Sequence, residues 1–291
     1  MLKYYFVADA KMSLVSHLLK HWAVARHAGV PWPETRMTRD ARTKPVYVAD
    51  PYTGRQPVAF NVSHQAGLVA LVVGFFAGDG ETETAAPGTD AVNVEVGVDI
   101  VCTGERRERD LRALRSEGGW TGFVDMHADV FGRRETAYLK GGDFPLPVQT
   151  QTPLAPDDFK LRHFYTLWCL REAYIKMTGD ALLAPWLGDL DFMRFRAPAP
   201  GAAAGDNAGD DDGLGPRGVP AENEVIAAHE ILFKGTPVGN ANVCIRSLGR
   251  EYMVCTAVRT PLRKEDALGL DLRCYDFLSL EDILAVAEVG Q

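Results

Sequence analysis

Hydrophobic residues recur along this chain at two spacings, one typical of helices and one typical of strands. Apolar side chains three or four positions apart predict helices from Lys11 to His27, from Phe123 to Leu139 and from Phe159 to Thr178. Gly179 follows the third of these segments and is a suitable C-terminal cap. A weaker helical pattern runs from Leu280 to Ala287, near the end of the chain.

Segments rich in β-branched and apolar residues predict strands before, between and after these helices. They are Lys44 to Val48, Val58 to Phe76 with a turn at Gln65-Ala66-Gly67, Val94 to Val101, Leu190 to Phe195, Glu230 to Phe233, Ala241 to Ser247 and Tyr252 to Val258. This order of elements predicts an α+β fold of two similar halves in a pseudo-two-fold arrangement, residues 1–95 and 96–291. We expect the active site in a cleft between the halves, because ligands often bind at such interfaces.

Two polar segments lack the large apolar side chains that a core requires. Gly78 to Asn93 predicts a surface loop. Ala197 to Asn223 predicts a disordered insertion in the second half, because its alanine, glycine, proline and aspartate residues bury too little surface to offset the entropy lost on ordering.

Composition restricts the class of protein. Of the 291 residues, 46% are hydrophobic and 24% are charged, as in a folded domain, and the net charge of −8 argues against nucleic-acid binding. The longest apolar run has 12 residues, whereas a membrane span needs roughly 20, and Asp9 interrupts the position of a signal peptide's apolar stretch. Five cysteines without CxxC spacing predict free thiols, so we expect a cytoplasmic protein without a membrane anchor.

An aspartate interrupts one of the predicted strands. Asp99 stands between Val98 and Ile100, where a carboxylate is costly to bury unless it is paired or binds a cation. Because strand side chains alternate, Asp99 and Val101 share one face. Asp99 is therefore a candidate metal ligand, and the alternative is an aspartate that caps a neighbouring loop.

The third predicted helix carries a glutamate and a lysine one turn apart. Glu172 and Lys176 share a face, with Trp168 one turn earlier. They form either an ordinary helix-stabilising pair beside a core tryptophan or half of a metal–diphosphate site. In the second case Glu172 ligates Mg²⁺ together with Asp99, and Lys176 meets phosphate charge.

The segment Phe60-Asn61-Val62-Ser63-His64 adds a hydroxyl and an imidazole that can donate hydrogen bonds to phosphate. The alternative for His64 is a hydrogen-bonded core histidine. Lys44, followed by Pro45, adds a cation. Neither a P-loop nor a G-x-G-x-x-G motif is present in the sequence.

These three segments together resemble the Sfp-type 4′-phosphopantetheinyl transferases. That family has N-[IV]-S-H, G-[IV]-D-[IV] and W-x-x-[KR]-E-[AS]-[YF]-x-K motifs, which correspond here to residues 61–64, 97–100 and 168–176. The resemblance extends from about Lys3 to Gly188, includes Lys44-Pro45, and is strongest to the large fungal members.

The resemblance implies transfer of the phosphopantetheine arm of coenzyme A to a serine of a carrier domain, with release of adenosine 3′,5′-bisphosphate. Asp99 and Glu172 would bind Mg²⁺, and Glu172 would also be the candidate base, directly or through water. Lys176 would neutralise the diphosphate. The residues expected to hold the coenzyme are Lys44, Asn61, Ser63, His64 and Lys176.

Three features depart from the family pattern. Val101 stands where bacterial members have a third carboxylate, so we expect a water molecule there. Ala8 stands where a basic residue commonly precedes the aspartate of the first helix. Relatives also have a strand-containing segment before the position of Lys3, which raises an alternative: a coenzyme A-binding protein that lacks transfer activity because this segment is missing.

The partners that the resemblance implies are carrier domains of polyketide synthases, non-ribosomal peptide synthetases, aminoadipate reductase or fatty-acid synthase, in secondary metabolism or lysine biosynthesis. We expect a monomer, because the two halves would form the site within one chain. An unrelated magnesium-dependent phosphohydrolase is a third alternative; it would release pantetheine phosphate without a carrier.

Overall fold

The structure is a computed structural model that describes residues 4–75, 94–145, 154–180, 184–201, 225–260 and 275–289. Its α-helices are α1 (Val7–Ala28), α2 (Arg107–Leu114), α3 (Gly119–Asp125), α4 (Arg133–Gly141), α5 (Pro156–Thr178) and α7 (Leu280–Val289). Short 3₁₀ turns are η1 (Trp32–Glu34), η2 (Ala128–Val130) and η3 (Leu187–Asp189). The predicted surface loop from Gly78 to Asn93 lies outside the described residues.

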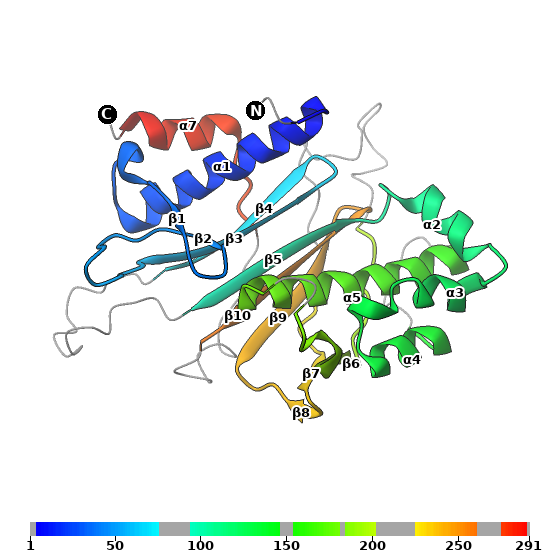
Figure 1. Cartoon of the computed structure of the whole chain (residues 1–291). Helices are drawn as coiled ribbons and strands as arrows, with labels where there is room; N and C mark the ends of the chain where they lie inside the picture. Colours follow the sequence, from blue (N-terminus) through cyan, green and yellow to red (C-terminus); the bar gives the residue numbers. More distant parts are fainter. Residues whose placement is uncertain are drawn as a thin grey trace.

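In the part of the chain that the structure describes, the strands form four small antiparallel sheets. They are β1 (Thr38–Arg39), β2 (Pro45–Val46), β3 (Val58–Gln65), β4 (Leu68–Phe75), β5 (Glu95–Cys102), β6 (Leu190–Met193), β7 (Glu230–Phe233), β8 (Thr236–Pro237), β9 (Ala241–Leu248) and β10 (Tyr252–Arg259). The mixture of helices and strands confirms the predicted α+β class (Figure 1). Among the described residues, no helix combines the length and the apolar character needed to cross a bilayer.

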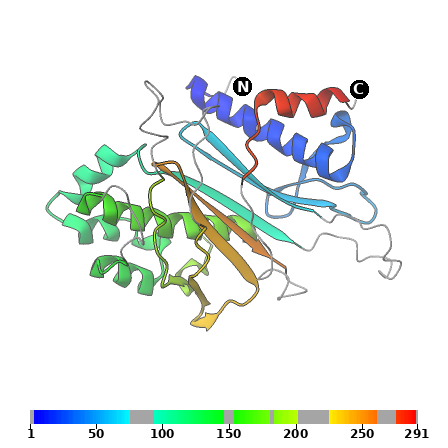
Figure 2. The same cartoon turned by 180° about the vertical axis from the view of Figure 1, so that it is seen from behind.

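The N-terminal part of the chain packs one long helix on one hairpin. Helix α1 lies against β3 and β4, and α7, from the opposite end of the chain, lies alongside α1 (Figures 1 and 2). A small core joins α1 to the hairpin; its buried members are Val24, Tyr47, Val58 and Phe60. The amphipathic pattern of α1 thus buries its apolar face against the hairpin.

The larger core lies between α5 and the sheet of order β5-β10-β9. Helix α5 crosses one face of this sheet and buries Leu167, Leu170 and Ala173 completely. The other face carries Val98 and Ile100 of β5, which pack with Val254 against apolar residues of β4, namely Leu68, Ala70 and Val72. The sheet is therefore covered on both faces, and β5 lies at the junction of the two parts of the chain.

Two sequence predictions need correction. The predicted helix from Phe123 to Leu139 is broken into α3 and α4, because Gly132 begins a new helix, where its amide donates to the Glu135 carboxylate at 2.7 Å. The predicted insertion also starts too early. Residues 197–201 are partly or fully buried, and the buried Arg162 guanidinium donates to the Pro198 carbonyl at 2.7 Å. The rest of the predicted insertion lies outside the described residues.

Candidate active site

Helix α5 reaches the β5 strand at a glycine. A Cβ atom on Gly97 would lie 2.1 Å from the Ala173 carbonyl oxygen and 2.4 Å from the Met177 amide nitrogen. Only a residue without a side chain permits this approach. Helix α5 continues to Gly179, whose φ of 77° gives the left-handed cap that the sequence predicted. The close contact brings the Glu172–Lys176 face of α5 beside Asp99.

A buried polar cluster joins β3, β5 and α5. The Lys176 ammonium lies 2.6 Å from Asp99 Oδ1 and 2.8 Å from Ser63 Oγ. The Ser63 hydroxyl donates to the same Asp99 oxygen at 3.0 Å. Asp99 and Ser63 are 6% and 7% exposed, whereas the Lys176 side chain is 29% exposed, so the cluster is buried at Asp99 and reaches solvent at Lys176. The structure thus brings together residues from all three motifs of the sequence.

Glu172 is the second carboxylate at this cluster. Burial and, to a lesser degree, the negative charge of Asp99 raise the pKa of Glu172, and Lys176 opposes them; together they bring this pKa to about 7. Burial also raises the pKa of Asp99, against the stabilising contacts of Lys176 and Ser63. Two carboxyl groups whose ionisation is disfavoured by burial, one of them also by the charge of the other, are suited to share a cation.

This donor set fits Mg²⁺ but does not enclose it. Mg²⁺ is usually held by one or two protein carboxylates, with phosphate oxygens and water completing its shell. Asp99 and Glu172 supply two, and Val101, on the same face of β5 as Asp99, supplies none. Within the described ranges, no group of three or more histidine, cysteine, aspartate and glutamate side chains gathers as a complete metal cage.

The other predicted coenzyme ligands have different surroundings. The Lys44 ammonium donates to the carbonyl of Val96 at 3.2 Å and to that of Lys176 at 3.4 Å, and burial lowers the pKa of Lys44. Asn61 Oδ1 accepts a hydrogen bond from the Val98 amide at 3.0 Å. His64 is exposed, and strand alternation directs it away from the face of β3 that carries Ser63. Among described residues, it makes no contact with the buried cluster.

A cavity of about 400 Å³ opens beside Lys44, between the β1–β2 segment, β3 and the end of α5. Its lining includes Arg42, Lys44, Pro45, Phe60 and Thr178. Arg42 also donates from its guanidinium to the Thr178 carbonyl, at the C-terminus of α5. The cavity therefore combines apolar walls with two cations and two carboxylates, Asp40 and Glu95, and it reaches Met177, the residue after Lys176.

Sequence reasoning missed a fully buried ion pair behind the site. Arg171, the residue before Glu172, lies 2.6 Å from Glu135, and their side chains are 2% and 0% exposed. Arg171 also donates to the carbonyls of Leu190 and Leu187, both at 2.7 Å. The available signal was an arginine within an otherwise apolar stretch of helix, since a buried charge requires a partner. The sequence did not indicate which acid would pair with it.

Comparison with known proteins identifies the family. Residues 1–74 match the sequence model of the 4′-phosphopantetheinyl transferase N-terminal domain, and residues 95–224 match that of the 4′-phosphopantetheinyl transferase superfamily. The chain is 41% identical to 4′-phosphopantetheinyl transferase 1 of Fusarium mangiferae over 287 residues, covering 99% of this chain and 82% of the relative. It is 37% identical to 4′-phosphopantetheinyl transferase NpgA of Emericella nidulans, covering 88% and 72%.

A more distant similarity extends to animals. The human L-aminoadipate-semialdehyde dehydrogenase-phosphopantetheinyl transferase is 25% identical over 180 residues, which are 62% of this chain and 46% of that protein. The two fungal relatives match nearly the whole chain at much higher identity. The chain therefore belongs to the 4′-phosphopantetheinyl transferase family.

Proposed function

We propose that this enzyme transfers the 4′-phosphopantetheine arm of coenzyme A to a serine of acyl or peptidyl carrier domains in a Mg²⁺-dependent reaction. Family membership implies coenzyme A as the donor substrate. The serine oxygen forms a bond to the phosphorus of the phosphopantetheine, and the phosphorus–oxygen bond of the diphosphate breaks. The products are the modified carrier and adenosine 3′,5′-bisphosphate.

The observation that carries the assignment of residues is the cluster of Ser63, Asp99 and Lys176 beside Glu172. We assign Asp99 and Glu172 as the residues that would hold Mg²⁺, which when bound would neutralise charge on the diphosphate. Lys176 adds a positive charge at the same place, and Ser63 adds a hydroxyl donor. Glu172, with its raised pKa, is suited to accept the serine proton directly or through water.

The coenzyme has a natural place next to this cluster. The cavity beside Lys44 has cations and apolar walls, which suit the phosphates and the organic portions of a nucleotide. We propose Lys44 as a coenzyme contact within the cavity and Asn61 and His64 as contacts outside it, with the exposed His64 on the opposite face of β3 from Ser63. Lys44 and Asn61 already hydrogen-bond to backbone groups of β5, so they would act in part by shaping the cavity.

We also propose that residues 1–95 and 96–291 act as two halves with the site between them. Each half sets a long helix on antiparallel strands, α1 on β3 and β4, and α5 on β5 and β10, which supports a pseudo-two-fold relation. Ser63 comes from one half and the carboxylates from the other. One chain supplies the whole cluster, which supports a monomer, and the buried free thiols Cys102, Cys169, Cys244 and Cys255 support a cytoplasmic location.

The alternative of a coenzyme A-binding protein without transfer activity is not favoured, because the relatives that match nearly the whole chain are named as transferases.

Incubating the protein with coenzyme A, Mg²⁺ and a panel of apo-carrier domains tests the proposal directly. The panel should cover polyketide synthase, non-ribosomal peptide synthetase, fatty-acid synthase and aminoadipate reductase carriers. A mass gain of one phosphopantetheine on a carrier supports it; release of pantetheine phosphate without carrier modification would support the phosphohydrolase instead.

The raised pKa of Glu172 predicts the pH dependence of transfer. A carboxyl group is charged above its pKa, and only the charged form can ligate Mg²⁺ or accept a proton, so activity should fall as pH drops through about 7. Mg²⁺ competes with the proton, so more Mg²⁺ should move this fall to lower pH. Measuring kcat/KM across pH at two Mg²⁺ concentrations checks both effects; an apparent pKa independent of Mg²⁺ would contradict the assignment.

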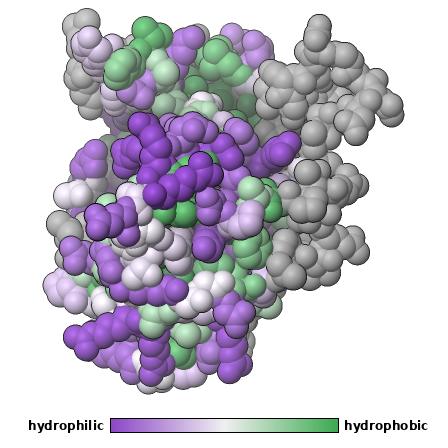
Figure 3. Space-filling view, turned by 90° about the vertical axis from the view of Figure 1, so that its right-hand side faces the viewer, coloured by the Kyte–Doolittle hydropathy of each residue, from purple (hydrophilic) through white to green (hydrophobic). Residues whose placement is uncertain are grey.

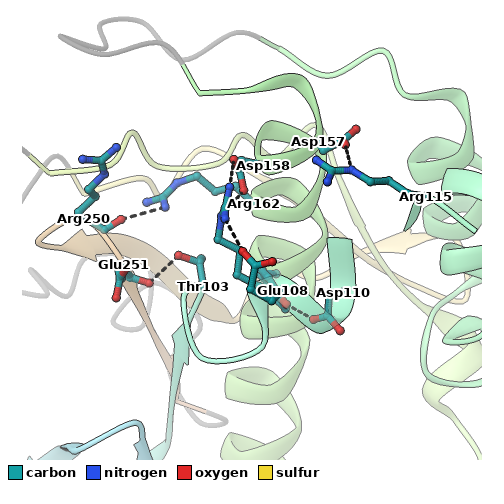
Figure 4. Close-up of polar contacts among 11 residues, drawn as sticks. Thr103, Glu108, Asp110, Arg115, Asp157, Asp158, Arg162, Arg250 and Glu251 are labelled. Atoms are coloured by element: carbon teal, nitrogen blue, oxygen red, sulfur yellow. Dashed lines mark hydrogen bonds and ion pairs between the residues drawn. The ribbon is translucent and has the colours of Figure 1, made fainter. Parts of the chain in front are cut away.

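The carrier domain must also dock on the enzyme, and we propose α2 and the residues around it as the docking surface. The face that bears α2 and α3 is largely hydrophilic, with small hydrophobic areas (Figure 3). Two arginines of this segment are already paired with acids at the start of α5. Arg107 lies 2.7 Å from Asp158, and Arg115 lies 3.1 Å from Asp157 (Figure 4). The exposed arginines that remain are Arg106 and Arg112, which form no ion pair among the described residues, and Arg109, which lies 3.7 Å from Asp110.

Changing Arg106, Arg109 and Arg112 together to glutamate is expected to raise the apparent KM for an acidic carrier by about tenfold, with the KM for coenzyme A unchanged. The reason is that a net charge of −8 repels an acidic partner unless a local basic surface offsets it. The effect should weaken with added salt. Changing Arg133 and Arg134, exposed on α4, to glutamate, compared with the double change of Arg106 and Arg112 to glutamate, is the matched charge control. An unchanged carrier KM at low ionic strength would exclude α2 as a steering surface.

A further inference from the structure

Strand β5 has one edge that is paired regularly and one that is not. The first edge forms an antiparallel ladder with β10. The second edge faces β3, yet in the described part of the chain β3 pairs only with β4 and belongs to a separate sheet. The backbone groups along this edge of β5 therefore need other partners, since unpaired buried amides are costly.

Side chains supply these partners at three residues of β5, namely Val96, Val98 and Cys102. Asn61 Oδ1 accepts from the Val98 amide at 3.0 Å, and Gln65 Oε1 accepts from the Cys102 amide at 3.2 Å. Further along, the Lys44 ammonium donates to the Val96 carbonyl at 3.2 Å. We call this set of side-chain contacts the seam.

The contacts of the seam lie on both sides of the buried cluster along β3. Asn61 and Gln65 lie two positions before and two after Ser63, so alternation places all three on the face of β3 that meets β5. Gln65 has a second anchor, because its Nε2 donates to Glu105 Oε2 at 2.6 Å. A shift of β3 by one residue would turn Ser63 away from Asp99. Fixing β3 on both sides of Ser63 prevents such a shift.

We propose that Asn61 and Gln65 are positioning residues of the transferase: they hold β3 in register with β5, and so keep the Ser63 hydroxyl and the Lys176 ammonium together on Asp99. This inference rests on the proposed function of that cluster. Gln65 itself contacts neither Ser63, Asp99 nor Lys176 in the described structure. Its effect on transfer would therefore pass through Ser63.

A reciprocal exchange tests the proposal. Gln65→Glu retains an acceptor for the Cys102 amide but places a second carboxylate against Glu105. Adding Glu105→Gln restores a donor–acceptor pair with the original net charge. The single change should lower kcat/KM for coenzyme A by about tenfold, and the double change should recover it to within about twofold, as expected for a charged hydrogen bond. Val62→Ala, on the other face of β3, is the control for lost packing alone.

A double-mutant cycle with Ser63→Ala separates positioning from simple stability. If Gln65 acts through Ser63, Gln65→Glu should have no further effect on kcat/KM in the Ser63→Ala background. Three results would each overturn the proposal. They are additive losses of kcat/KM in the cycle, no rescue by Glu105→Gln, and an equal loss of kcat/KM from Val62→Ala at the same melting temperature. Calorimetric binding of coenzyme A to the same variants gives a second readout. If the wild type binds coenzyme A but modifies no carrier, the proposed function fails while the seam is still tested by binding.

Discussion

Replacing Glu172 by glutamine or Asp99 by asparagine is expected to lower transfer by about a hundredfold to ten-thousandfold. These are the two carboxylates that the structure places at the buried cluster, and Val101 cannot substitute for either of them. Both changes keep the side-chain shape, so the fold should persist. Asp129→Asn, at an exposed aspartate, is the matched control. Turnover close to that of the wild type at saturating Mg²⁺ would show that the metal assignment is wrong.

Stability should respond to Glu172→Gln in the opposite direction from activity. The pKa of Glu172 is about 7 in the folded protein and 4.5 without the fold, so the folded state prefers the protonated carboxyl group. The stability that comes from protonating Glu172 in the folded state is fully present below pH 4.5 and is lost as pH rises through about 7. Glutamine resembles the protonated form. Without Mg²⁺, the variant should therefore melt higher than the wild type above pH 7 and equally below pH 4.5.

The features that could be predicted from the sequence are those set by local pattern. Alternation around Asp99 correctly gave the two faces of β5, since Val98 and Ile100 pack against β4 while Val101 joins the core beneath α5. The hairpin turn at Gln65-Ala66-Gly67 was confirmed, because neighbouring residues fix it. Both depend on interactions within a few positions of the chain.

The features that could not be predicted depend on residues far apart in sequence. No residue near Gln65 in the sequence indicates that its side-chain oxygen accepts a hydrogen bond from the Cys102 amide of β5. Likewise, Glu135 and Arg171 are 36 residues apart, and many acids could have partnered that arginine. The break between α3 and α4 was missed because the apolar spacing continues across Gly132, where a capping contact with Glu135 restarts the helix. In each case a tertiary contact outweighs the local pattern.

Gly97→Ala is expected to be the most damaging single-methyl change among the strand glycines. The new Cβ would meet the Ala173 carbonyl oxygen at 2.1 Å and the Met177 amide nitrogen at 2.4 Å. These are backbone atoms of α5, which cannot rotate away as side chains do, so the helix itself must move. Overpacking of this kind typically costs about 3 kcal/mol or more of unfolding free energy when the backbone is involved.

The same displacement should impair catalysis in the molecules that remain folded. Glu172 and Lys176 lie on the helix that must move, whereas Asp99 and Ser63 do not, so a shift of α5 separates the two sides of the cluster. Gly74→Ala is the matched control: its Cβ would approach only side-chain methyl groups, those of Val94 at 3.2 Å and Val96 at 3.3 Å. Chemical denaturation and kcat measured well below the melting temperature should both show a much larger loss for Gly97→Ala. Equal effects of the two substitutions would mean that the Gly97 contact does not set the position of α5. The cluster would then owe its geometry to the buried Arg171 pair and the seam alone.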